Sequence, residues 1–238
     1  MQLCKKTLTF LMANNVDMKD IYIFVSPSSY EEYNNYFANN HTTNIILPKN
    51  SITAARNHII EYFDEGEQIV ELDDDVEDIK TTEKNVKNTS ITNFKDLCTE
   101  LFKLSEGGLW GLNATHNNYF ATNNIRKGLY SIINSCCGYT NDKDIKLTVQ
   151  EKEDFDRVCQ FYHKGKTVIK DGRHGVQTKY WTNKGGIQAK YNREERVKVQ
   201  KKSAEDLMKK WPQYCSTRTR KNGIVDIRFK RMKTNCVI

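Results

Sequence analysis

Short apolar runs alternate with amphipathic segments along the first half of the chain, and this alternation restricts the folds open to it. Residues 21–25, 44–47 and 68–72 are rich in isoleucine, valine and other large apolar side chains, which is typical of buried strands. Between them, residues 30–37 and 52–63 repeat apolar side chains at helical spacing. Such an alternation predicts an α/β fold with a mixed, mostly parallel sheet flanked by helices.

The same patterns extend along the rest of the 238 residues. They predict helices at 7–16, 94–102, 153–162 and 192–211, and strands at 109–115, 128–134, 167–169 and 224–229. Residues 80–92 are expected to form a loop, and residues 171–175 a turn. Without an internal repeat or a Gly/Ser-rich linker, one continuous domain is expected, with a core at 1–190 and a basic helix and strand at 191–238 packed on it.

Several protein classes are disfavoured by composition. No run approaches about 18 apolar residues, so neither a membrane-spanning helix nor a membrane partner is expected. The apolar stretch at residues 8–13 is too short for a signal peptide. Seven cysteines, without metal-type spacing, indicate reduced thiols. We therefore expect a cytoplasmic protein that is not secreted.

Charge is distributed unevenly along the chain. The net charge is +7, yet the residues from Arg157 onward hold 22 Lys and Arg against 6 Asp and Glu, whereas the first 156 residues hold 15 against 24. An acidic front and a basic back favour a metal or sugar site in one part and a polyanion-binding surface in the other. Two differently solvated faces without a ligand are the alternative.

Three consecutive carboxylates, Asp73, Asp74 and Asp75, directly follow the strand predicted at residues 68–72. Adjacent carboxylates repel one another and raise each other's pKa, so a triplet needs a nearby cation or full solvation. A divalent ion that bridges substrate phosphates is a common solution. The alternative is an acidic surface turn, but a position beyond the carboxyl end of a buried strand favours a metal site.

The segment at residues 50–57 places a helix N-terminus near the same sheet edge. Arg56 and Asn57 supply further donors that could reach a nucleotide. A surface helix with an exposed arginine explains this segment equally well.

A second acidic pair, Glu153 and Asp154, opens the helix predicted at residues 153–162. Acidic residues in a first helical turn commonly serve only to stabilise the helix dipole. The functional interpretation is a general base that the dipole keeps ionised, with Asp154 the first candidate and Glu153 the next. Farther along the chain, His174 is a candidate metal ligand or phosphate contact, and Lys184 lies in a glycine-containing turn that could close over a pyrophosphate.

Taken in order, the strand at 21–25, Ala55-Arg56-Asn57, Val70-Glu71-Leu72-Asp73-Asp74-Asp75-Val76 and Glu153-Asp154 resemble a GT-A-type glycosyltransferase. The resemblance covers roughly residues 7–190 and is greatest to the TET/JBP-associated glycosyltransferases, found largely in phages and large DNA viruses. It implies a GT-A-like, Rossmann-type fold and, for a viral protein, the host cytoplasm. That family is thought to add sugars to hydroxymethylated pyrimidines in DNA.

The resemblance also implies roles for individual residues. Asp73 and Asp74 would orient the ribose of the donor or a metal-bound water, and Asp75 would bind Mn²⁺ or Mg²⁺ directly, with Asp73 and His174 as further metal ligands. Arg56 would contact the uracil or the diphosphate of a UDP-sugar, with UDP-glucose the expected donor. Asp154 would be the base of an inverting transfer to a hydroxymethylated pyrimidine such as 5-hydroxymethylcytosine.

Basic residues near the C-terminus fit binding to a phosphate backbone. The candidate nucleic-acid contacts are Lys198, Lys201, Lys202, Lys209, Lys210, Arg218 and Arg220. Two alternatives stay open: a transferase acting on a glycan, protein or small molecule, and a catalytically silent nucleic-acid-binding module. The oligomeric state is open as well.

Overall fold

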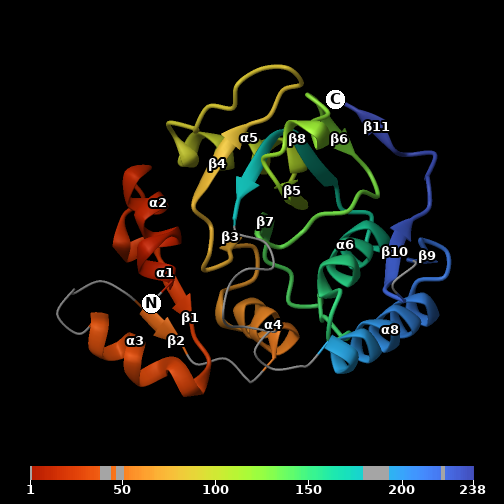
Figure 1. Ribbon diagram of the computed structural model, residues 1–238, viewed down its shortest axis with the longest axis horizontal. Helices are drawn as coiled ribbons and strands as arrows, with labels where there is room; N and C mark the ends of the chain where they lie inside the picture. Colours follow the sequence, from red (N-terminus) through yellow and green to blue (C-terminus); the bar gives the residue numbers. More distant parts are fainter. Residues whose placement is uncertain (1, 38–43, 47–50, 179–192, 221–222) are drawn as a thin grey trace.

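A computed structural model describes residues 2–37, 44–46, 51–178, 193–220 and 223–238, and it is a mixed α/β structure in which helices flank a central sheet (Figure 1). The N-terminal part alternates helices and strands as predicted. Its elements are α1 (Gln2–Lys5), α2 (Thr7–Ala13), η1 (Met18–Asp20), β1 (Tyr22–Phe24), η2 (Pro27–Ser29), α3 (Tyr30–Phe37), β2 (Asn44–Ile46) and α4 (Ile52–Tyr62). Strands β1 and β2 pair in parallel as a separate two-stranded sheet.

Within the described residues, seven strands form the central sheet. They are β3 (Gln68–Leu72), β4 (Asp78–Thr81), β5 (Leu109–Asn113), β6 (Ile125–Lys127), β7 (Cys136–Thr140), β8 (Val168–Gln177) and β11 (Cys236–Val237). Their order is β11-β6-β8-β5-β7-β3, and β4 pairs with β8.

The sheet is mixed, but the prediction that it is mostly parallel is wrong. Of the ladders described in this sheet, β5–β8 is parallel and the other five are antiparallel. Much of the difference comes from β7, which the sequence patterns did not predict. This strand lies between β3 and β5 and runs antiparallel to both.

Three local predictions also need correction. Strand β8 continues through the turn predicted at 171–175. Its register against β5 shifts there: Leu112 pairs with Asp171, and the next residue, Asn113, pairs with Gly175. Strand β4 extends to Thr81, into the predicted loop, and Lys80 forms a bridge to Ser90. The strand predicted at 128–134 is absent from the described structure; the pairing strand is β6, which ends at Lys127.

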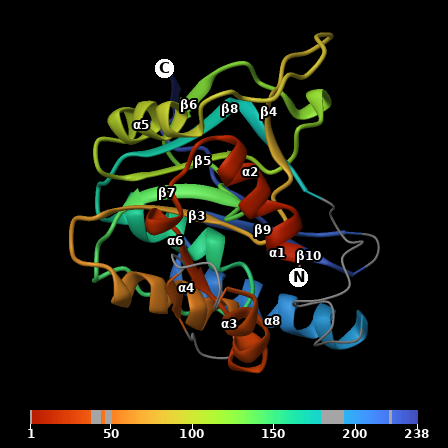
Figure 2. The ribbon, with the colours of Figure 1, turned by 90° about the vertical axis from the view of Figure 1, so that its left-hand side faces the viewer.

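Two apolar cores lie on opposite faces of the central sheet. In Figure 2, α5 (Phe94–Ser105) lies on one side of β3, β5 and β7, and α4 and α6 (Glu153–His163) lie on the other. The first core joins α5 and α2 to the sheet and contains Leu101 and Trp110. The second contains Ile60 of α4 and Phe161 of α6.

The C-terminal part packs on α6. It consists of α8 (Arg193–Lys210) and a two-stranded antiparallel sheet of β9 (Cys215–Thr219) and β10 (Val225–Phe229). A third core joins these elements to Val149 and Cys159. A short 3₁₀ turn, η3 (Asn118–Phe120), completes the described elements. None of the described helices is both long and apolar enough to cross a lipid bilayer.

Candidate active site

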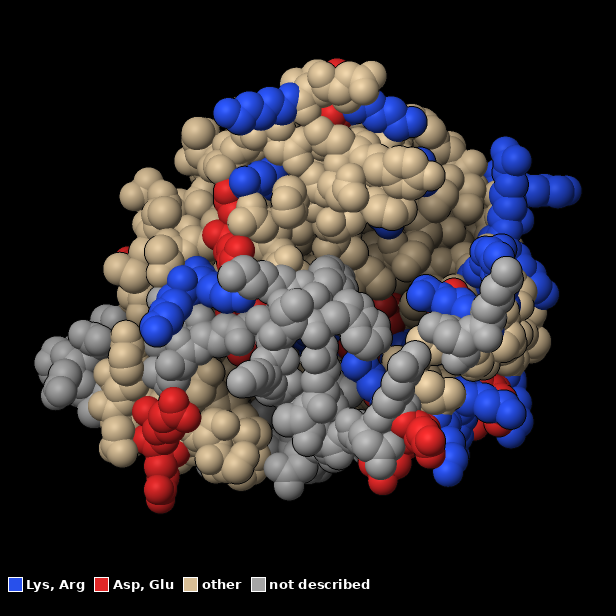
Figure 3. All heavy atoms as spheres, viewed as in Figure 1, with Lys and Arg blue, Asp and Glu red and all other residues tan. Residues whose placement is uncertain are grey.

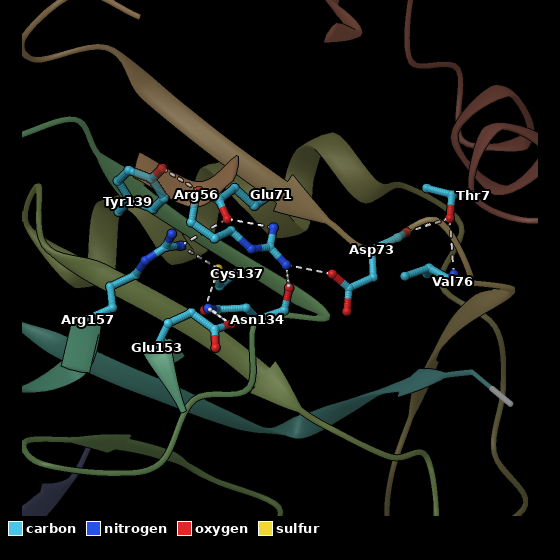
Figure 4. A network of polar contacts seen from close by, with 10 residues as sticks. All are labelled: Thr7, Arg56, Glu71, Asp73, Val76, Asn134, Cys137, Tyr139, Glu153 and Arg157. Atoms are coloured by element: carbon cyan, nitrogen blue, oxygen red, sulfur yellow. Dashed lines mark hydrogen bonds and ion pairs between the residues drawn. The ribbon is translucent and has the colours of Figure 1, made fainter. Parts of the chain in front are cut away.

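Arg56 lies at the centre of a buried polar network that joins α4 to the carboxyl end of β3 (Figure 4). Ser51 caps α4 by accepting a hydrogen bond from the amide of Ala54 (3.1 Å), and Arg56 follows in the next turn. Arg56 is 6% exposed; its Nη1 donates to Glu71 Oε2 (2.8 Å) and its Nη2 to Asp73 Oδ1 (2.6 Å). Burial alone would lower the pKa of Arg56, but the carboxylates of Glu71 and Asp73 outweigh it and keep the guanidinium charged.

Glu71 is shared between two arginines. Arg157 of α6 is fully buried and forms an ion pair with the same Glu71 oxygen that Arg56 contacts (3.0 Å), while the Tyr139 hydroxyl donates to the other oxygen. The Arg157 guanidinium also lies over the Tyr139 ring, 4.8 Å from its centroid. Burial would raise the pKa of Glu71, yet Arg157 and Arg56 together lower it, so the carboxylate stays ionised inside the protein.

Thr7 holds the turn that carries the three aspartates. Its Oγ1 donates to the Asp73 carbonyl oxygen (2.7 Å) and accepts from the Val76 amide (3.0 Å), which closes the turn against α2. The Asp73 side chain is 40% exposed. The pKa values of Asp74 and Asp75 are raised by partial burial and by the negative charge of Asp73, and Lys6 offsets this only in part.

Glu153 and Asp154 begin α6 on the opposite side of the site. Asn134 connects the two sides, because its backbone oxygen accepts from Arg56 Nη2 (3.4 Å) and its side-chain amide donates to Glu153 Oε1 (3.5 Å). Burial and the adjacent Glu153 raise the pKa of Asp154 to about 7. Burial also raises the pKa of Glu153, although Arg56 opposes the shift.

A pocket of about 330 Å³ opens between these groups. Its lining includes Arg56 and Asp73 from the first two motifs and Glu153 and Asp154 from the third, together with Asn134 and Phe155. Three sequence motifs that lie up to about 100 residues apart therefore meet at one cavity. Asp73 lies on one side of the pocket and Glu153 and Asp154 lie on the other, with the buried Arg56 between them.

Other candidate residues take different places. Asn57 is bonded to the backbone of Leu147 through both its amide nitrogen (2.9 Å) and its oxygen (2.8 Å), which gives it a structural role. The Nδ1 atom of His174 is hydrogen-bonded to the carboxylate of the buried Asp171 on β8 (2.8 Å), and Arg173 binds the same carboxylate. Lys184 lies outside the described residues.

Asp74 and Asp75 are in the turn beside Asp73 but are not among the residues that line the pocket. Within the described parts of the chain, no group of three or more His, Cys, Asp and Glu side chains is arranged to hold a metal ion, so His174 does not join the aspartates in such a group.

The candidate nucleic-acid contacts divide into exposed and bound side chains. Lys198, Lys201, Lys202, Lys209 and Arg218 are exposed. Lys210 instead forms an ion pair with the buried Asp156 (2.9 Å). Arg220 is exposed but is paired with Asp226 (2.6 Å).

Sequence reasoning did not single out several residues of this network. Glu71 had a signal, because a charged residue inside a buried strand requires a buried partner. Asn134, Tyr139 and Arg157 had no comparable local signal, since they reach Glu71, Arg56 and Glu153 only through the tertiary fold. Thr7 was assigned only to a short helix.

No protein-family model matches the chain, and the search of curated proteins finds no match either.

Proposed function

We propose that the protein is a metal-dependent glycosyltransferase of GT-A type that moves a sugar from a UDP-sugar to a hydroxyl group, with a hydroxymethylated pyrimidine in DNA as the expected acceptor. One observation carries this proposal: Asp73, at the end of β3, and the Glu153–Asp154 pair, at the start of α6, line the same pocket. A metal-bound leaving group and a general base need this arrangement, in which separate carboxylates act on the two sides of a reacting centre.

The donor set of the acidic turn fits a hard divalent cation. Asp73, Asp74 and Asp75 offer only oxygen atoms. Burial, together with the negative charge of the neighbouring carboxylates, raises the pKa of Asp74 and Asp75, and a bound cation would offset that charge. Mg²⁺ and Mn²⁺ that bind with nucleotides commonly use one or two protein carboxylates, and phosphate and water complete the coordination. Asp73 and Asp75 would hold the ion, which would neutralise charge on the departing diphosphate.

Asp154 has the properties of the proton acceptor. With a pKa of about 7, its carboxylate is a stronger base than an ordinary aspartate and is still largely ionised slightly above neutral pH. A positioned base of this kind contributes about 10²–10⁴-fold to the rate. In the proposed reaction the acceptor hydroxyl loses its proton to Asp154 as its oxygen attacks the anomeric carbon, and the bond from that carbon to the diphosphate breaks.

Arg56 takes a different part in this proposal from the one that the family resemblance implies. Both terminal nitrogens of its guanidinium already bind protein groups, namely Glu71, Asp73 and the Asn134 carbonyl. We therefore assign it as a positioning residue, which fixes Asp73 on one side of the pocket and, through Asn134, Glu153 on the other.

Calorimetric titration of UDP in the presence of Mn²⁺ tests the donor half of the proposal. Saturable heat is expected with the wild-type protein, and a loss of at least about tenfold in affinity is expected for Asp75→Asn. Asp64→Asn is the matched control, since Asp64 is an exposed carboxylate in the α4–β3 connection. An absence of heat with the wild-type protein, or equal affinities for both variants, would contradict the assignment of the metal site.

A further inference from the structure

The β9–β10 ribbon, formed by residues Cys215–Thr219 and Val225–Phe229, has one apolar and one basic face. Cys215 pairs with Phe229 and Thr217 with Ile227, and Cys215, Ile227 and Phe229 belong to the core shared with α6 and α8. Because side chains alternate along a strand, the intervening residues face the other way.

The outward face carries arginine. Ser216 lies opposite Arg228, and Arg218 lies opposite Asp226, so both arginines are on the face turned away from the core. Both are exposed. Asp226 is paired with Arg220, and within the described residues no carboxylate forms an ion pair with Arg218 or Arg228.

The chain that follows the ribbon continues this basic surface. Lys230, Arg231 and Lys233 are all exposed, and Asp226 is the only acidic residue between Trp211 and Ile238 in the sequence. Figure 3 shows lysine and arginine side chains gathered along the right-hand edge of the molecule, where Figure 1 places β9 and β10.

Helix α8 also exposes several lysines, but its surface is of mixed charge rather than basic. Its exposed lysines, Lys198, Lys201, Lys202 and Lys209, share the outer face with Glu194, Glu195, Glu205 and Asp206. Lys198 follows Glu194, and Lys201 precedes Glu205, by four residues, the spacing at which opposite charges on a helix attract each other. In Figure 3 the area below the ribbon accordingly mixes red and blue.

We infer that the outer face of the β9–β10 ribbon, with Arg231 and Lys233 beside it, is the surface that binds duplex DNA, and that α8 is not. Unpaired arginines bind phosphate oxygens well. A two-stranded ribbon has a width that the major groove of B-form DNA accommodates, whereas the deep, narrow major groove of A-form RNA excludes it. A substituent at the 5-position of a pyrimidine projects into that same major groove.

The ribbon is joined to the proposed active site by direct packing. Phe155, which lines the pocket, contacts Phe229 on the inner face of β10, with ring centroids 5.1 Å apart. Arg196 and Gln200 of α8 also line the pocket. DNA on the ribbon would therefore be held by the element that supports the pocket wall. The choice of DNA rests on the acceptor class in the proposed function, but the choice of surface rests on charge and topology alone.

Three triple variants of the full chain, each lacking three positive charges, test this inference. The ribbon variant is R218Q/R228Q/R231Q, the helix variant is K198Q/K201Q/K202Q, and a remote control is K84Q/K87Q/K103Q, all at exposed positions. Binding of a fluorescent B-form duplex is measured by anisotropy over a range of salt concentrations, without any sugar donor.

We expect the ribbon variant to bind DNA at least about tenfold more weakly. The negative slope of its log K against log salt should be less steep than that of the wild-type protein by about 2–3. The helix and remote variants should change affinity by less than about twofold. Equal losses in all three variants, or a larger loss in the helix variant, would overturn the inference. So would equal wild-type affinity for double-stranded RNA of the same sequence.

Because binding is measured without donor, the two proposals fail separately. Strong ribbon-dependent DNA binding without sugar transfer would refute the proposed function and leave the ribbon inference standing. Sugar transfer to DNA by the wild-type protein, together with unchanged DNA affinity in the ribbon variant, would support the proposed function and refute the ribbon inference.

Discussion

Arg56 combines a structural and a functional task in one side chain. It lies 2.8 Å from Glu71 and 2.6 Å from Asp73, so its charge stabilises a buried carboxylate and fixes a carboxylate at the pocket. From sequence, Arg56 was correctly placed near the aspartates, but it was expected to contact a ligand. Its burial follows from Glu71, whose charge inside β3 requires cations close by.

We expect Arg56→Met to lower the free energy of unfolding by about 3 kcal/mol, because Glu71 would stay buried with Arg157 as its one remaining cation. Urea denaturation measures this change. Lys103→Met, an exposed substitution on α5, should change stability by less than about 0.5 kcal/mol. Similar stabilities for the two variants would show that the network around Glu71 does not depend on Arg56.

Asp154 predicts a particular pH dependence. Because its pKa is raised to about 7, the ionised base that transfer needs is depleted below that pH. We expect kcat/KM to fall about tenfold per pH unit well below neutrality and to level off above about pH 8. A profile that is flat from about pH 5.5 to about pH 8 would remove Asp154 from the role of base.

The same shift predicts that Asp154 destabilises the fold at neutral pH. A carboxyl group whose pKa rises on folding, here from 3.8 towards about 7, binds more protons when folded, so its contribution to stability is lost as pH rises through that range. Asp154→Asn keeps an oxygen that can accept from the Phe155 amide. This variant should raise the free energy of unfolding by about 1–2 kcal/mol at about pH 8, as measured by chemical denaturation. A lower free energy of unfolding than that of the wild-type protein would contradict the argument.

At the scale of elements, the contact between α2 and the acidic turn determines how rigidly the aspartates are held. Thr7→Val leaves the Val76 amide buried without its acceptor and the Asp73 carbonyl without its donor. We expect a loss of about 1–3 kcal/mol in stability and weaker Mn²⁺ binding. Thr7→Ser keeps the hydroxyl and should retain metal binding. Equal Mn²⁺ affinity for the valine and serine variants would show that the turn keeps its shape without α2.

Most elements with strong local patterns were predicted correctly, although the apolar run at 128–134 forms no strand in the described structure, and elements without such patterns were missed. The serine cap of α4 and the apolar run of β3 are local signals, and both elements occur where expected. Strand β7 contains two cysteines and a glycine, which carry little strand signal. At Gly138 an added Cβ would lie 2.3 Å from the Trp110 ring, so a residue that weakens the local pattern is required by packing between strands.

Strand β8 shows a related difficulty. Asp171, Gly172 and Gly175 are typical of a turn, yet they lie within a strand that pairs on both edges. Asp171 is buried because Arg173 and His174 bind its carboxylate. The local turn signal is overridden by pairing partners that are distant in sequence.

At the scale of the molecule, the candidate site is assembled from five separate segments of the described chain, which include residues 56, 73, 134, 153 and 200. Sequence order and the carboxyl end of β3 predicted that the Arg56 segment lies near the aspartates, and the family resemblance added Glu153 and Asp154 to the same site. They could not supply the links through Asn134 and Arg157, because these depend on how β7 and α6 pack together.

The attachment of the C-terminal part depends on Asp156. This fully buried carboxylate accepts from the Thr148 amide (2.9 Å) and from Trp211 Nε1 (2.8 Å), and it pairs with Lys210 (2.9 Å). Lys210→Met removes its cation and should cost about 2–4 kcal/mol and speed proteolysis of residues 193–238. The neighbouring exposed Lys209→Met is the control, and equal proteolysis rates would show that Asp156 does not secure this part.

Transfer of a sugar to a hydroxymethylated base tests the central claim most directly. The protein is incubated with Mn²⁺, a panel of UDP-hexoses and a duplex that contains 5-hydroxymethylcytosine, and the DNA is then digested and analysed by mass spectrometry. We expect the modified nucleoside to gain the mass of one hexose with wild-type protein and not with Asp154→Asn. A nucleoside of unchanged mass with every donor, together with intact UDP-hexoses, would contradict the account.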